Sequence, residues 1–222
     1  MLNLWDEVCK LASTINFSNE EDFLVWQFSS KGIYSVQSLY KIVNFRGIKP
    51  VLVPSIWKIK IPPRVQYFLW LLSKNKLLTR DNLSKRRKVK DPTCLFCAEK
   101  ETISHLFFYC VVAQYLWKLL SKIFDVQLGN SLDSIGKFWL SNKRNGILNL
   151  FTLAGFWSLW KLRNDLCFQR NQWRCMAILL YKLVSLVQNW EILYSEEQRQ
   201  VIQCKVVMIK EVASQELWLP WK

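Results

Sequence analysis

The sequence predicts a mostly α-helical protein with a small N-terminal β-hairpin and a CCHC zinc knuckle, followed by a C-terminal helical region. Apolar residues recur at helical spacing in several segments, and the 222 residues include only six glycines and six prolines, too few to punctuate many short strands. Two cysteines, a histidine and a third cysteine lie close together near the middle of the chain. A hydrophobic fraction of 51% with 22% charged residues is typical of a globular protein, and the length suits one or two small domains.

The N-terminal region is expected to begin with a short helix and an acidic turn over residues 1–22. Residues 23–28 and 32–36 are rich in β-branched and aromatic side chains and flank a small polar turn at 29–31, which predicts the hairpin. Ser35 is placed to cap a helix that follows it. A linker is predicted over residues 46–54, where glycine and proline break any helix.

Helical spacing returns after the linker. The pair Pro62-Pro63 suits a helix start, and Thr79 suits the N-cap of a shorter helix that ends near Arg87. Helices are also predicted after the Cys/His cluster and between residues 145 and 213, with breaks near 171–172 and 194–195. The longest apolar stretch, residues 146–160, is shorter than the ~20 residues that span a bilayer, so it predicts a buried helix and no membrane partner.

The Cys/His cluster is the most specific motif. It has the spacing C-x2-C-x7-H-x4-C and consists of Cys94, Cys97, His105 and Cys110. Two cysteines separated by two residues can face one metal across a tight turn, and a His and a Cys separated by four residues on a helix can both reach one point. Three thiolates and one imidazole form the closed tetrahedral site of structural Zn²⁺, and soft sulfur ligands favour zinc over magnesium or calcium. The alternative is a core of free thiols with an incidental histidine.

The remaining cysteines, Cys9, Cys167, Cys175 and Cys204, are scattered among apolar residues and are expected to be buried. The chain does not open with a basic segment followed by an apolar stretch, so no secretory signal is predicted. An intracellular location, nuclear or cytoplasmic, is therefore expected. In that reducing setting, clustered Cys and His residues are expected to bind a metal, and disulfides between the cysteines are less favoured.

Charge gives the second signal. The formal net charge is +14 and the pI about 9.6, which favours polyanions, nucleic acid first and anionic membrane second. Phosphate contacts are expected from the basic segment, namely Lys58, Lys60, Arg64, Arg80, Lys85, Arg86, Arg87, Lys88 and Lys90. Trp57, Tyr67, Phe68 and Trp70 interleave with these cations, and core positions are expected for most of them. The basic run could instead be a solvated face or a nuclear import signal.

A catalytic function is not predicted. The sequence contains no glycine-rich loop to cradle phosphates and no Asp-Asp pair preceded by an aromatic residue. His105 is the only histidine, and it is expected to bind the metal, so a Ser-His-Asp or Cys-His catalytic set has no histidine available. A catalytic zinc would keep one ligand position open, whereas four protein ligands fill this site.

Several motifs in a fixed order resemble a known family: residues 32–40, 56–65, 68–70 and 77–83, then the Cys/His segment with Glu101-Thr102, then Trp117. This series is similar to the zinc-binding domain found after the reverse transcriptase in plant non-LTR (LINE-type) retrotransposons. The segment 157–164 also resembles one that often follows that domain. The resemblance implies Zn²⁺ at the four ligands and descent from a retrotransposon polyprotein. It divides the chain into residues 1–32, with the N-terminal helix and first hairpin strand, the zinc-binding domain at 33–120, and a helical region at 121–222.

The sequence thus predicts a non-catalytic zinc-binding module that binds RNA or DNA through a basic surface. No polymerase, endonuclease or ribonuclease H motif of the parent polyprotein occurs in the sequence. One alternative is a helical scaffold module with a purely structural zinc, which would bind a partner protein. Another is a retroelement relic without a present function. Exposed tryptophan clusters would favour the scaffold, and buried tryptophans with a continuous basic groove would favour nucleic-acid binding.

Overall fold

The structure is a computed structural model that describes residues 2–14, 24–29, 31–43, 56–89, 91–168 and 173–216. These residues form helices joined by loops, so the prediction of a mostly helical protein is confirmed. The chain divides into two compact units, Met1–Lys49 and Pro50–Lys222. Each unit is described by itself.

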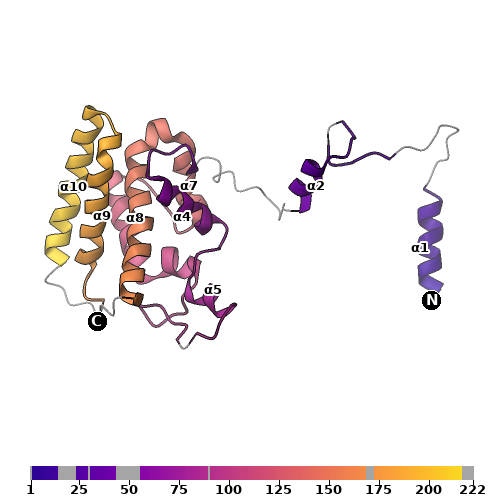
Figure 1. The fold of residues 1–222 in the computed structure, drawn as a ribbon, viewed down its shortest axis with the longest axis horizontal. Coiled ribbons are helices and arrows are strands. Elements are labelled where there is room, and N and C mark those ends of the chain that lie inside the picture. Colours follow the sequence, from indigo (N-terminus) through magenta and orange to yellow (C-terminus); the bar gives the residue numbers. More distant parts are fainter. Residues whose placement is uncertain are drawn as a thin grey trace. The chain divides into compact units, whose positions relative to one another are not determined.

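The first unit contains α1 (Leu2–Ala12) and α2 (Val36–Val43) (Figure 1). Ser35 caps α2 as predicted. Its Oγ accepts a hydrogen bond from the Ser38 N–H, and the Ser38 Oγ accepts one from the Ser35 N–H, both at 3.1 Å. This reciprocal pair satisfies amide groups that have no partner inside the helix.

The predicted N-terminal hairpin is wrong. Residues 24–29 and 31–35 contain no strand in the part of the chain that the structure describes. The Trp26 N–H donates to the Gly32 carbonyl at 2.7 Å, and the neighbouring bonds around Ser29 only close turns. An isolated two-stranded hairpin is marginal in water, so β-rich composition alone did not suffice to form one. Phe23 and Ser30, which belong to the same prediction, lie outside the described residues.

The second unit is built on three long helices, α8 (Asn142–Phe168), α9 (Met176–Trp190) and α10 (Glu196–Glu216). Helix α9 packs against both α8 and α10, and Figure 1 shows the three side by side. Short helices lead into them: α7 (Leu132–Gly136) and η2 (Lys137–Ser141) precede α8, and η3 (Glu191–Leu193) precedes α10.

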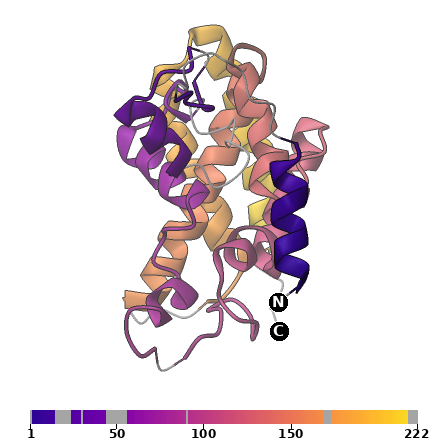
Figure 2. The ribbon, with the colours of Figure 1, turned by 90° about the vertical axis from the view of Figure 1, so that its right-hand side faces the viewer.

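The other half of this unit supplies α4 (Pro63–Ser73), α5 (Arg80–Ser84), the π-helical turn η1 (His105–Tyr109) and α6 (Val111–Phe124). Helix α4 begins at Pro63 as predicted, since the first helical position needs no N–H donor. Thr79 precedes α5 as predicted, but its hydroxyl donates to Asp81 Oδ1 at 2.5 Å instead of accepting from a backbone amide. Figures 1 and 2 both show α5 below α4.

The second unit has one hydrophobic core, which runs from Ile56 to Ala213. The Phe68 ring of α4 packs edge-on against Trp157 of α8, with centroids 5.0 Å apart, and Trp117 of α6 packs against Phe156 of α8 at 4.7 Å. Gly155 permits this close approach, because a Cβ there would lie 3.2 Å from the Trp117 ring. The segment with the predicted ligands and the C-terminal helices therefore share their core.

Among the described residues, Met176–Leu193 is the one stretch long and apolar enough to cross a bilayer. Its apolar side chains include Leu180, Leu183 and Val187, which are fully buried. Because α9 lies between α8 and α10, packing in the core accounts for its composition.

Candidate metal centre

The first two predicted ligands lie in a tight loop, here called the knuckle loop (residues 92–101). Thr93 and Lys100 form an antiparallel bridge, and the Cys94 N–H donates to the Glu99 carbonyl at 2.7 Å. The Phe96 N–H also approaches the Cys94 Sγ at 3.5 Å. The short turn therefore brings Cys97 back toward Cys94, as the C-x2-C spacing predicts.

The other two ligands depend on the π-helical turn η1. The Cys110 N–H donates to the His105 carbonyl at 2.7 Å, which is the i→i+5 bond of a π-helix. In an α-helix, residues five apart point about 140° away from each other, given 3.6 residues per turn. The wider π turn brings them back to one side, so it explains how the H-x4-C spacing serves a single metal. The Trp117 indole N–H donates to the Phe107 carbonyl at 2.6 Å and holds this turn against α6.

The structure brings the four predicted ligands together. The Sγ atoms of Cys94 and Cys110 lie 3.9 Å apart, and the Cys97 Sγ lies 3.1 Å from the His105 Nε2. All four ligand atoms fall within 4.8 Å of one another. Zn–S bonds of about 2.3 Å in a tetrahedron would separate two sulfurs by about 3.8 Å, so the donor set fits such an ion. Cys94 and Cys110 are buried, and the other two ligands are half-buried.

Hydrogen bonding makes the three thiols unequal. The bond from the Cys110 thiol lowers the pKa of Cys94 to about 6. That same bond, together with burial, raises the pKa of Cys110, and burial raises the pKa of Cys97. Near neutral pH the protein groups alone favour one thiolate, so an ion that binds all three sulfurs must displace protons from the other two.

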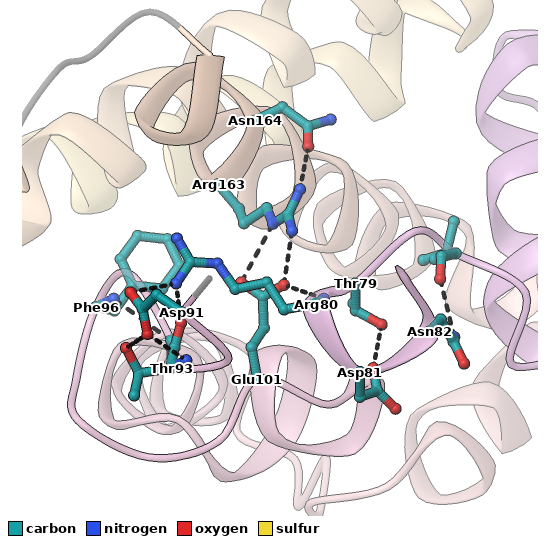
Figure 3. A network of polar contacts seen from close by, with 12 residues as sticks. Thr79, Arg80, Asp81, Asn82, Asp91, Thr93, Phe96, Glu101, Arg163 and Asn164 are labelled. Carbon is teal, nitrogen blue, oxygen red and sulfur yellow. Dashed lines mark hydrogen bonds and ion pairs between the residues drawn. The ribbon is translucent and has the colours of Figure 1, made fainter. Parts of the chain in front are cut away.

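Glu101 is a residue of this centre that the sequence did not assign to it. Its side chain is fully buried and points toward Arg163 and the backbone of Arg80 (Figure 3). The Oε1 atom accepts hydrogen bonds from the Arg80 N–H at 2.8 Å and the Arg163 Nη2 at 2.7 Å, and Oε2 accepts one from the Arg163 Nε at 3.2 Å. The knuckle loop is therefore tied to α5 and to α8 through one carboxylate.

Arg163 had a detectable signal in the sequence. It follows the apolar residues of α8, is 1% exposed and also donates to the Asn164 Oδ1 at 3.1 Å. Arginine is almost never fully buried unless it is paired, so an arginine on an apolar helix indicates a buried partner. Sequence reasoning assigned it no chemistry because nothing local identified Glu101 as that partner.

Seven of the nine predicted phosphate-contacting residues are exposed: Lys58, Lys60, Arg64, Lys85, Arg86, Arg87 and Lys88. The first three precede or begin α4, and the other four follow α5. The seven therefore form two groups along the chain, one at the start of α4 and one directly after α5. Lys90 lies outside the described residues.

Arg80 differs from the exposed cations. Its Nη1 lies 2.7 Å from Asp91 Oδ2 and 2.6 Å from the Thr93 carbonyl oxygen, and its side chain is 14% exposed. The Thr93 hydrogen bonds and this guanidinium lower the pKa of Asp91 to about 2. The guanidinium of Arg80 is thus engaged in holding the knuckle loop.

The scattered cysteines do not join the centre. The prediction that they are buried is wrong for Cys9 and Cys204, which are exposed, while Cys167 and Cys175 are half-buried. Cys204 lies on α10, the outer helix of the three, so its surroundings depend on how α10 packs and not on its apolar sequence neighbours.

Known proteins match the segment of the chain that contains the four ligands. A family model described as zinc-binding in reverse transcriptase matches residues 34–117, which contain all four ligands. The chain is also 28% identical over 101 residues to a protein of Arabidopsis thaliana named "Putative ribonuclease H protein". That similarity covers 43% of this chain and 16% of the Arabidopsis protein. No solved structure matches the chain. Residues 34–117 are therefore a reverse-transcriptase zinc-binding domain of retroelement origin, as the sequence motifs indicated.

Proposed function

We propose that this chain is a non-catalytic zinc-binding module that binds RNA or DNA through its exposed cations. The observation that carries the proposal is the position of seven exposed Lys and Arg side chains on the segments that lead into the metal centre, in a chain with a formal net charge of +14. Each Lys or Arg that neutralises a phosphate releases counterions, and this release favours binding without any base contact.

The metal in this proposal is zinc. Three sulfurs and one imidazole nitrogen suit its tetrahedral preference, and the half-buried to buried setting suits a structural ion. The non-catalytic role follows from the ligand count. Four protein ligands leave no position for an exchangeable water, which a hydrolytic zinc site requires.

The burial of tryptophans supports nucleic-acid binding over the scaffold alternative. Trp117, Trp139 and Trp190 are at most 4% exposed, and Trp157 and Trp160 pack against Phe68. Trp117, Trp139 and Trp190 therefore lie in the core, and Trp157 and Trp160 are half-buried against it, so these five indoles do not form the exposed cluster that a protein partner would bind.

The test is the salt dependence of binding by the zinc-loaded chain. A variant in which Lys85, Arg86, Arg87 and Lys88 are all replaced by Ala should bind oligonucleotides more weakly. The slope of log K against log salt should shrink by about 0.7 to 0.9 for each phosphate that the variant no longer neutralises. A charge-matched control replaces Lys118, Lys122, Lys161 and Lys210, which are exposed elsewhere on the unit. Equal affinity and equal slope for the native chain and the first variant would contradict the proposal.

A further inference from the structure

Two aromatic side chains of the basic segment are exposed. Trp57 is 50% exposed and Tyr67 is 54% exposed, whereas Phe68 is 3% exposed and belongs to the core. The prediction that most of these aromatics are buried is therefore wrong for Trp57 and Tyr67. Packing in the core does not explain why two large aromatic side chains occur among exposed cations.

The turn before α4 presents Trp57 together with two lysines. Ile56, Ile59 and Ile61 are buried and anchor this turn, while the intervening Trp57, Lys58 and Lys60 are exposed. Burial of the three isoleucines fixes the turn on the core and leaves the indole and both ammonium groups on its outer side.

Helix α4 presents Tyr67 beside the same turn. The Gln66 Nε2 donates to the Ile59 carbonyl at 3.0 Å, which ties the turn to the helix next to Tyr67. Arg64 lies three residues before Tyr67, so the two side chains are neighbours on one face of α4. The bond between Gln66 and Ile59 therefore joins two segments that each carry an exposed aromatic and at least one exposed cation.

Tyr67 is also held in place by a second ring. It stacks on Trp70 with centroids 5.6 Å apart and an angle of 29° between the ring planes. Because this contact orders the phenol ring in advance, a further ring that stacks on it has less side-chain entropy to remove.

We infer that Trp57 and Tyr67 form a stacking platform for the bases of a single-stranded nucleic acid, whose phosphates contact Lys58, Lys60 and Arg64. The inference rests on the proposed function and adds the class of nucleic acid. Exposed aromatics interleaved with cations are the arrangement by which proteins bind single strands without sequence preference, since every base has a face to stack. In a duplex the base faces are stacked on one another, so no base face is available to stack on Trp57 or Tyr67.

The experiment compares oligo(dT), oligo(U) and a blunt DNA duplex, each of about 12 nucleotides or base pairs, a length within the usual range of single-strand sites. Fluorescence anisotropy measures their affinity for the zinc-loaded chain and for Trp57→Ala and Tyr67→Ala. The conservative variants Trp57→Phe and Tyr67→Phe keep a ring at each position. Tyr181→Ala is the matched control, because Tyr181 is an exposed aromatic on α9.

The platform predicts that the native chain prefers the single strands to the duplex. Each Ala variant should lose about fivefold or more in affinity for the single strands, with the salt slope unchanged, because stacking releases no counterions. The Phe variants and Tyr181→Ala should bind nearly as the native chain does. Equal affinity for duplex and single strands, or no loss in either Ala variant, would overturn the inference and leave the proposed function standing if the four-cation variant still binds weakly. Failure of the native chain to bind any probe would overturn both.

Discussion

The Glu101 carboxylate and the Arg163 guanidinium form a two-point ion pair across 62 residues of sequence, at 2.7 and 3.2 Å. Both side chains are at most 2% exposed. The pair joins the knuckle loop to α8, so the C-terminal helical layer positions a residue that lies between the metal ligands Cys97 and His105 in the sequence (Figure 3). Arg163 is thus a positioning residue for a centre it does not touch.

Replacing Arg163 with Met should lower the free energy of unfolding by about 3–5 kcal/mol, because it leaves the buried Glu101 carboxylate without its counter-charge. Urea unfolding of the zinc-loaded chain measures this loss. The double variant Glu101→Gln/Arg163→Met should be destabilised by less than the sum of the two single changes, since it removes both charges together. Lys182→Met is the control. It breaks the more exposed Lys182–Asp165 pair and should cost no more than about 1 kcal/mol. Additive losses in the double variant would contradict a direct coupling.

Removal of the metal ligand Cys110 should release the ion and destabilise the second unit. Cys110→Ser should bind less than one equivalent of zinc, and its loss of stability should approach about 4 kcal/mol where free zinc stands about 1,000-fold above its Kd in the native chain. Metal analysis and thermal unfolding followed by circular dichroism give the two readouts. Cys204→Ser, at an exposed cysteine outside the centre, should keep both the metal and the stability. Equal metal content in the two variants would show that the four residues do not form the binding site.

The family segment 34–117 should not fold when it is produced alone. It lacks α8, which packs on Phe68 and Trp117 and supplies Arg163 to Glu101. We expect the isolated segment to show no cooperative thermal transition even with zinc present. The compact unit Pro50–Lys222 is the control and should unfold cooperatively. A cooperative transition in the isolated segment would mean that the shared core is dispensable for it.

Tyr194 should make the protein less stable at alkaline pH. Burial raises the pKa of Tyr194 from 10.0 to about 12, and its hydroxyl donates to the Gly146 carbonyl at 3.3 Å. Its contribution is therefore fully present below pH 10 and is lost as the pH rises toward 12, because the unfolded chain releases the proton first. The stability difference between the native chain and Tyr194→Phe should shrink above pH 10 by about 1.4 kcal/mol per pH unit.

Urea unfolding between about pH 8 and 11 measures this difference, a window set by the linkage of proton binding to stability. Tyr181→Phe, at an exposed tyrosine, controls for alkaline effects that do not depend on burial. A stability difference that stays constant with pH in the Tyr194 pair would show that this phenol titrates alike in the folded and unfolded chains.

Local sequence signals determined the elements and the ligand set of this protein. Ser35 and Pro63 mark helix starts because capping and the missing proline N–H act within one turn. The four metal ligands lie within 17 residues, so their spacing alone predicts that one loop and one turn can bring them together. The prediction of an N-terminal hairpin was wrong because a two-stranded hairpin needs further strands or a helix to pack against, and local composition does not supply these.

Tertiary structure decided which side chains are buried and which distant residues meet. Trp57 and Phe68 are both aromatics of the basic segment, yet Trp57 is exposed on the turn before α4 and Phe68 lies on α4 against α8, because the packing of these two segments on the core differs. Glu101 and Arg163 meet because α8 passes over the knuckle loop, a contact that no pattern within either segment encodes. The periodicity of apolar residues shows which face of a helix will be buried. Which other helix packs on that face depends on how distant segments come together in the common core.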